Sequence, residues 1–169
     1  MKSSSSDRWV SYLVAATVAV TVLLLGLERF GIWQPSEVHV ADLARDLIAG
    51  NTVQLDRPPV QVSLVAAGFR MGHASELWGR LPGALLSLLA VASLMTAARG
   101  LGDRRLAAYT GIAYATLPLV FMNARQMLGG GIAQSATTLG VAGLALAIWG
   151  VDRRWQLAGA AFTVLGLAL

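Results

Sequence analysis

Long apolar runs separated by short polar turns make up most of the sequence, and this alternation limits the folds that the chain can adopt. The runs cover residues 10–27, 81–98, 106–122, 132–150 and 155–169. An α-helix needs about 20 mostly apolar residues to cross the hydrocarbon core of a bilayer. In that core each backbone polar group must be satisfied within the protein, so runs of this length predict helices. The sequence therefore predicts an all-α polytopic membrane protein.

The composition supports this fold class and excludes several kinds of site. Only 13% of the 169 residues are charged and 56% are hydrophobic, whereas soluble domains carry roughly a quarter charged residues. The chain has no cysteine, which excludes a disulfide framework and a thiolate metal site. No basic tract is interleaved with aromatic residues, so membrane lipids, and not nucleic acid, are the expected partners.

The two ends of the chain need separate interpretation. Residues 10–27 fit an uncleaved anchor or a signal peptide, because Lys2 and Arg8 precede them. Their length and the lack of an A-x-A site before Glu28 favour the anchor, with residues 1–9 as a cytoplasmic tail. The last run, 155–169, is about five residues short of a crossing. We therefore expect the chain to be the N-terminal part of a longer protein.

Charges are distributed unequally over the two sides that these runs define. One side carries seven basic and three acidic residues: Lys2, Arg8, Arg99, Arg104, Arg105, Arg153 and Arg154, against Asp7, Asp103 and Asp152. This excess equals the net charge of +4, so the side with the long loop 29–80 is neutral. Short loops rich in arginine stay in the cytoplasm. The N-terminus is thus predicted inside and loop 29–80 outside.

The outer loop contains two predicted interfacial helices. The first begins with Ser36 as its N-cap and ends at Gly50-Asn51. On a helical wheel its apolar residues share one arc, and its charged residues lie opposite: Val40, Leu43, Ala44, Leu47 and Ile48 against Asp42, Arg45 and Asp46. A second helix is expected over 60–71, once the rigid Pro58-Pro59 pair has passed.

Two features of this loop allow alternative interpretations. Glu37 falls on the apolar arc of the first helix. It is either a first-turn acid favoured by the helix dipole or an acid turned toward a cavity in the membrane domain. Asp56 and Arg57, beside the prolines, are either a surface ion pair of little energetic weight or an acid and a cation positioned for phosphate.

Three ordered segments resemble a known family. IWQPSEVHVADLARDLI, then DRPP, then GRLPGALLSLL are similar to the N-terminal part of GT-C glycosyltransferases, in particular lipid A aminoarabinose transferases and protein-mannosyltransferase-like enzymes. The resemblance implies a GT-C-type transmembrane bundle in the bacterial inner membrane. It also implies transfer of a sugar from a polyprenyl-phosphate carrier to a lipid or protein acceptor on the periplasmic side.

The resemblance also implies roles for individual residues. Glu37 would be the catalytic carboxylate, and the carrier phosphate would be bound by Arg57, His39 and Arg125. Supporting positions of the family pattern fall on Asp42, Arg45 and Asp56. The acid matching Asp56 is associated with metal binding in some relatives, but further ligands would lie outside this chain. We therefore expect no metal site within it, and a divalent metal only in the full-length protein.

The chain departs from the family pattern at two places. Ser36 stands where the family has its leading aspartate, and Gly129–Gly131 stand where relatives carry a second acid. We interpret the triple glycine as a flexible turn, Arg80 as an interfacial anchor and His73 as a solvated loop residue.

The departures leave a second hypothesis open, namely a catalytically inactive relative that binds the carrier lipid or a partner protein. A transporter is disfavoured, because the four complete runs carry no charge at mid-depth.

Overall fold

The structure is a computed structural model that describes residues 5–29, 35–51, 57–102 and 104–169. All its regular elements are helices, which confirms the predicted all-α class for the described residues. They are α1 (Ser5–Leu24), α2 (Pro35–Ala49), α3 (Pro59–Met71), α4 (Glu76–Gly100), α5 (Arg104–Ala115), α6 (Pro118–Ala124), α7 (Gly129–Trp149) and α8 (Arg153–Ala168).

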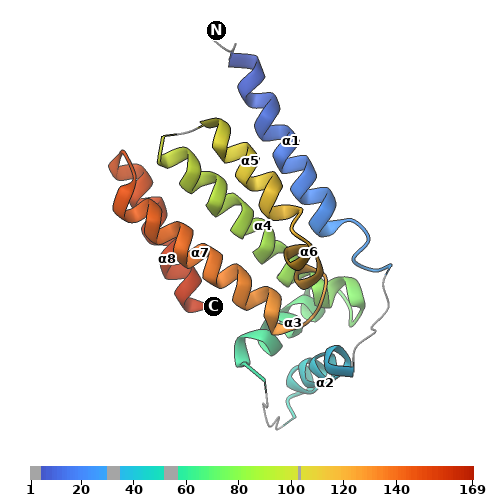
Figure 1. Cartoon of the computed structure of the whole chain (residues 1–169). Coiled ribbons are helices and arrows are strands. Elements are labelled where there is room, and N and C mark those ends of the chain that lie inside the picture. The colour runs from blue at the N-terminus through green and yellow to red at the C-terminus, as the bar shows by residue number, and fades with distance from the viewer. Residues whose placement is uncertain (1–4, 30–34, 52–56, 103) are drawn as a thin grey trace.

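The longer helices lie side by side, and α2 and α3 cover one end of them (Figure 1). Helix α4 occupies the centre, where it contacts α1, α3, α5 and α7, and α8 packs along α7. Polar side chains also join the helices. The hydroxyl oxygens of Ser87 and Ser135 are 3.3 Å apart between α4 and α7, and those of Tyr114 and Thr138 are 2.9 Å apart between α5 and α7. Polar contacts of this kind are also found between the helices of membrane bundles.

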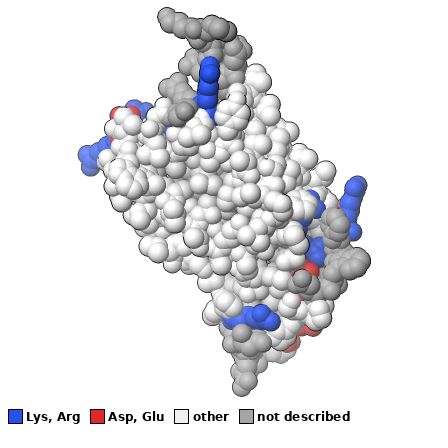
Figure 2. Space-filling view, viewed as in Figure 1, with Lys and Arg blue, Asp and Glu red and all other residues white. Residues whose placement is uncertain are grey.

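Helices α4 and α7 are long and apolar enough to cross a membrane. Only 39% of the apolar window of each is buried within the protein, so most residues of each window are at least partly exposed. An apolar surface of this extent on a folded chain indicates contact with lipid or another apolar partner. Figure 2 shows a broad surface without charged residues, with arginine and acidic side chains gathered toward the two ends of the molecule.

The third apolar run, expected as one span over 106–122, is broken. Helices α5 and α6 meet at a bend of 63° and count as a third candidate span only if the bent pair is taken together. Pro118 begins α6 and Leu117 before it is extended, with φ −61° and ψ 128°. Proline lacks an amide hydrogen and disfavours helical backbone in the preceding residue. Pro118 therefore indicates the break in the sequence itself, and the prediction of one continuous span did not take it into account.

The first run also ends earlier than expected. Helix α1 stops at Leu24, and its apolar part, Trp9–Leu24, is shorter than a full span. Gly26 adopts a φ of +75°, a left-handed conformation that ends helices and suits glycine. The predicted limit at residue 27 was therefore three residues too late.

The two predicted loop helices are present. Helix α2 ends where expected, at Ala49, and is followed by Gly50 with a φ of +78°. It begins at Pro35, so Ser36 lies in its first turn and is not its N-cap. Proline suits the first helical position because its missing amide would have no partner there. Helix α3 likewise begins at Pro59.

The apolar arc of α2 packs on α3. Val40, Leu43 and Ala44 are buried in a cluster with Val62 and Phe69 of α3. The arc is buried only in part, because Leu47 and Ile48 at its far end remain exposed. This packing fixes the face that Glu37 presents to the rest of the protein.

Candidate functional site

A buried ion pair joins α2 to α4. Glu37 and Arg80 are each only 3% exposed. Nε of Arg80 donates to Oε1 of Glu37 at 2.9 Å, and Nη2 donates to Oε2 at 3.2 Å. Glu37 lies in the first turn of α2 and its side chain is turned inward, as the two interpretations expected in turn, but it meets Arg80 and does not line the pocket described below. Arg80, expected to be an interfacial anchor, is instead the partner of Glu37.

Each member of the pair holds a further chain segment. The backbone amide of Met127, between α6 and α7, donates to Oε1 of Glu37 at 3.0 Å. Nη1 of Arg80 donates to the carbonyl of Leu27 at 2.8 Å. The pair therefore ties α2, α4, the end of α1 and the start of α7 at one point. Because the bridge between two planar groups is bidentate, it also fixes their orientation.

A second arginine completes the cluster at the end of α1. Arg125 donates through Nη2 to the carbonyls of Val22, at 3.2 Å, and Leu25, and it lies 4.3 Å from the ring centre of Phe121. Burial lowers the pKa of Arg125, and the nearby Arg80 guanidinium lowers this pKa further. The last carbonyls of a helix lack partners within it and favour cations. Arg125 therefore caps α1, and Arg80 holds the carbonyl of Leu27, three residues beyond the end of that helix.

The triple glycine belongs to this packed region. Gly129–Gly131 form the first turn of α7, so the expectation of a flexible turn was wrong. A Cβ on Gly131 would lie 2.4 Å from the carbonyl oxygen of Asn123. Glycine is needed there because the backbones approach so closely. Beside it, buried Gln61 donates to the carbonyl of Met127 at 3.0 Å.

An open pocket of about 420 Å³ lies next to this cluster. Its charged and titratable lining consists of Glu28, Arg45, His73 and Glu76, and its remaining wall is Ala41, Phe69, Ala74, Ser75, Leu77 and Met127. Met127 connects the two features, because it lines the pocket while its amide binds Glu37. His73, expected as a simple loop residue, is exposed at this pocket.

The other predicted site residues are spread over this end of the protein. His39 is exposed on α2. Asp42 and Arg45 form an exposed pair at 2.8 Å within α2, and the Arg45 guanidinium lies 5.8 Å from the ring centre of Phe69. Arg57 precedes α3, and its Nε is buried without a hydrogen-bond partner in the described part of the chain.

The structure thus brings only some of the predicted residues together. Arg125 joins the Glu37 cluster, and Arg45 reaches the pocket. No described contact brings His39 or Arg57 to Glu37. Asp56 lies outside the described residues. Within the described ranges, no group of three or more histidine, aspartate or glutamate side chains could hold a metal ion.

Comparison with known proteins adds no family assignment. No protein-family model, curated protein or solved structure matches this chain.

The geometry defines what the buried Glu37–Arg80 cluster and the open pocket can each do chemically. Glu37 accepts three hydrogen bonds and is buried, which suits a positioning role better than proton transfer. The pocket, in contrast, contains carboxylates that a ligand can reach, because Glu28 is exposed and Glu76 is half-buried. Sequence patterning missed Glu28 and Glu76 because each borders an apolar run and belongs to no motif. The sequence did indicate that Glu37 would have a cationic partner such as Arg80, because an acid that is buried needs one.

Proposed function

We propose that the chain is the N-terminal part of a polytopic membrane glycosyltransferase of the GT-C type. In this proposal the enzyme moves a sugar from a polyprenyl-phosphate carrier to a lipid or protein acceptor. It lies in a bacterial inner membrane, with the N-terminus in the cytoplasm and the α2–α3 end in the periplasm. The observation that carries the proposal is the open pocket at this end, in which two carboxylates and a guanidinium line the same space.

The reaction requires a base, a cation and exclusion of water. The acceptor hydroxyl oxygen forms a bond to the anomeric carbon while the bond from that carbon to the carrier phosphate breaks. The proton of the hydroxyl passes to a carboxylate, and the phosphate leaves with the electron pair, stabilised by cations. Glu28 or Glu76 is the proposed proton acceptor, and Arg45 is the proposed phosphate contact. Glu37 and Arg80 act as positioning residues that hold α2 over the pocket.

Sequence and structure support this proposal in different ways. The ordered segments around Glu37, Arg57 and Arg80 supply the family resemblance. The partly exposed apolar residues of α4 and α7 are compatible with packing against the long chain of a lipid carrier. The excess of arginine on the opposite turns favours the proposed orientation.

A second candidate is a catalytically inactive relative that binds the carrier lipid. Two observations favour it: both oxygens of Glu37 are already engaged, and Gly129–Gly131 supply no acid. This candidate uses the same pocket but predicts binding without turnover.

A transfer assay with the full-length protein separates the two candidates. Purified enzyme in lipid vesicles is offered a polyprenyl phosphate carrying a radiolabelled sugar, together with lipid and protein acceptors. We expect Glu28→Gln or Glu76→Gln to lower kcat by about 10²-fold or more, the effect of a lost general base. The matched control is Glu37→Gln, measured at equal folded fraction. Carrier binding without transfer by the unmodified protein would favour the inactive relative, and the absence of both would overturn the proposal.

A further inference from the structure

The end of the bundle opposite α2 and α3 carries a second concentration of charge. Here the turn between α4 and α5 meets the turn between α7 and α8. The amide of Val151 donates to the carbonyl of Gly100 at 3.3 Å, so the two turns are joined directly. Arginines lie in and beside both turns, and four of them are exposed: Arg99, Arg105, Arg153 and Arg154. Among the described residues of these two turns, Asp152 is the acidic one.

Arg99 is held between helices by aromatic rings. Its guanidinium lies 5.6 Å from the ring centre of Tyr12 on α1 and 5.7 Å from that of Trp155 on α8. Cation–π contacts orient a guanidinium without neutralising it. The charge of Arg99 is therefore fixed in place and still exposed.

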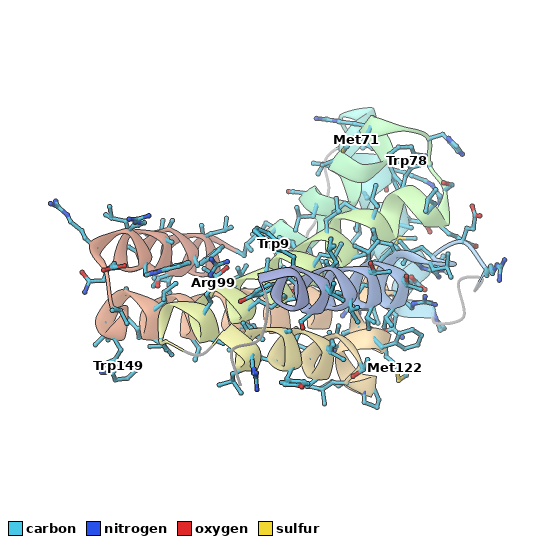
Figure 3. All side chains as sticks on the ribbon, turned by 90° about the horizontal axis from the view of Figure 1, so that it is seen from above. Trp9, Met71, Trp78, Arg99, Met122 and Trp149 are labelled. Atoms are coloured by element: carbon cyan, nitrogen blue, oxygen red, sulfur yellow. The ribbon has the colours of Figure 1, made fainter. Side chains whose placement is uncertain are left out.

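The apolar surface next to these arginines is the kind that faces acyl chains. Helices α4 and α7, the two candidate spans, both end here, and Trp149 at the end of α7 is 66% exposed. In Figure 3, Arg99 and Trp149 lie toward one side of the molecule, and Met71 and Trp78 toward the other. Exposed tryptophan at the end of a span is typical of the level of lipid headgroups. The arginines thus lie where a lipid phosphate would be.

We propose that this end, formed by Arg99, Arg105, Arg153 and Arg154, binds the headgroups of anionic phospholipids. The ligand is a lipid and not a free anion, because the charges adjoin an apolar surface on which acyl chains pack. The inference requires membrane embedding but does not depend on the proposed transfer reaction. Basic residues beside a span attract anionic headgroups by about 1 kcal/mol each, which corresponds to about a fivefold change in affinity per arginine.

Titration of lipid into the purified whole chain tests the proposal. The protein is kept in a detergent with a neutral headgroup, and bound lipid is counted by mass spectrometry of the intact complex. Phosphatidylglycerol should bind more tightly than phosphatidylcholine. The double variant Arg153→Gln/Arg154→Gln should lose about 25-fold in affinity for phosphatidylglycerol, as expected for two arginines at about fivefold each.

The matched control removes two arginines from the other end of the protein. Arg29 and Arg70 are exposed there, and Arg29→Gln/Arg70→Gln should bind phosphatidylglycerol like the unmodified chain. Circular dichroism of both variants verifies that they are equally helical. Equal loss in the two double variants, or equal binding of the two lipids, would overturn the proposal. Displacement of the lipid by inorganic phosphate at the same concentration would instead identify a free-anion site and would also overturn it.

Discussion

The two ends of this protein carry charge in opposite ways. At the α2–α3 end, Glu37 and Arg80 are 3% exposed and hydrogen-bonded to each other. At the opposite end, Arg99, Arg153 and Arg154 are exposed and outnumber Asp152, the described acid of the same turns. A buried charge must be paired because leaving water costs several kcal/mol per ion, whereas an exposed charge keeps its hydration. The buried pair therefore specifies how segments meet, and the exposed arginines remain able to bind an external anion.

The largest difference between the ends should appear when one buried partner is removed. Arg80→Ala leaves Glu37 buried without its cation and removes the hydrogen bond to the carbonyl of Leu27, so we expect a loss of about 3–5 kcal/mol in unfolding free energy. Reversible unfolding in mixed micelles, followed by circular dichroism, measures it. The control is Asp42→Ala, which breaks the exposed Asp42–Arg45 pair and should cost at most about 1 kcal/mol. Similar small losses of unfolding free energy in both variants would show that the Glu37–Arg80 pair does not hold these segments together.

A smaller effect should separate two glycines of the same helix. Gly131→Ala places a methyl group against the Asn123 carbonyl, at 2.4 Å in the present backbone, so the α6–α7 turn must shift at a cost of about 1–3 kcal/mol. Gly140→Ala is the matched control, because, apart from its own stretch of helix backbone, no atom lies within 4 Å of the position that its methyl group would occupy. Alanine is the better helix former, so this variant should be neutral or more stable by up to about 1 kcal/mol. Thermal unfolding of the two proteins under one condition provides the comparison, and destabilisation by both would refute the packing argument.

The smallest effect is expected at the exposed end. Arg99→Gln removes contacts with the rings of Tyr12 and Trp155, each worth about 0.5–1 kcal/mol at an exposed site. We expect a total loss of about 1–2 kcal/mol in unfolding free energy. Arg153→Gln, which removes an exposed arginine with no described ring contact, should change stability by no more than about 0.5 kcal/mol. If Arg99→Gln lowered the unfolding free energy as much as Arg80→Ala, the contrast between the two ends would be wrong.

Much of the helical plan followed from local patterns in the sequence. The apolar runs predicted α4 and α7, Gly50 predicted the end of α2, and Pro58-Pro59 predicted the start of α3 to within one residue. These signals act within a few residues, because helix period, capping and proline sterics are local properties. The break that escaped prediction, between α5 and α6, was also local, since Pro118 had been treated as part of an apolar run.

What the sequence determined alone is where hydrocarbon-compatible helices form and on which face Glu37 lies. What only the tertiary structure decided is what Glu37 meets: Arg80 is 43 residues away in the chain and Met127 is 90. The pocket carboxylates Glu28 and Glu76 likewise come from separate segments. A periodic pattern fixes which side of a helix is apolar, but it carries no information about which distant segment packs there. That choice depends on the summed packing and on the need to pair every buried charge, which exist only in the folded chain.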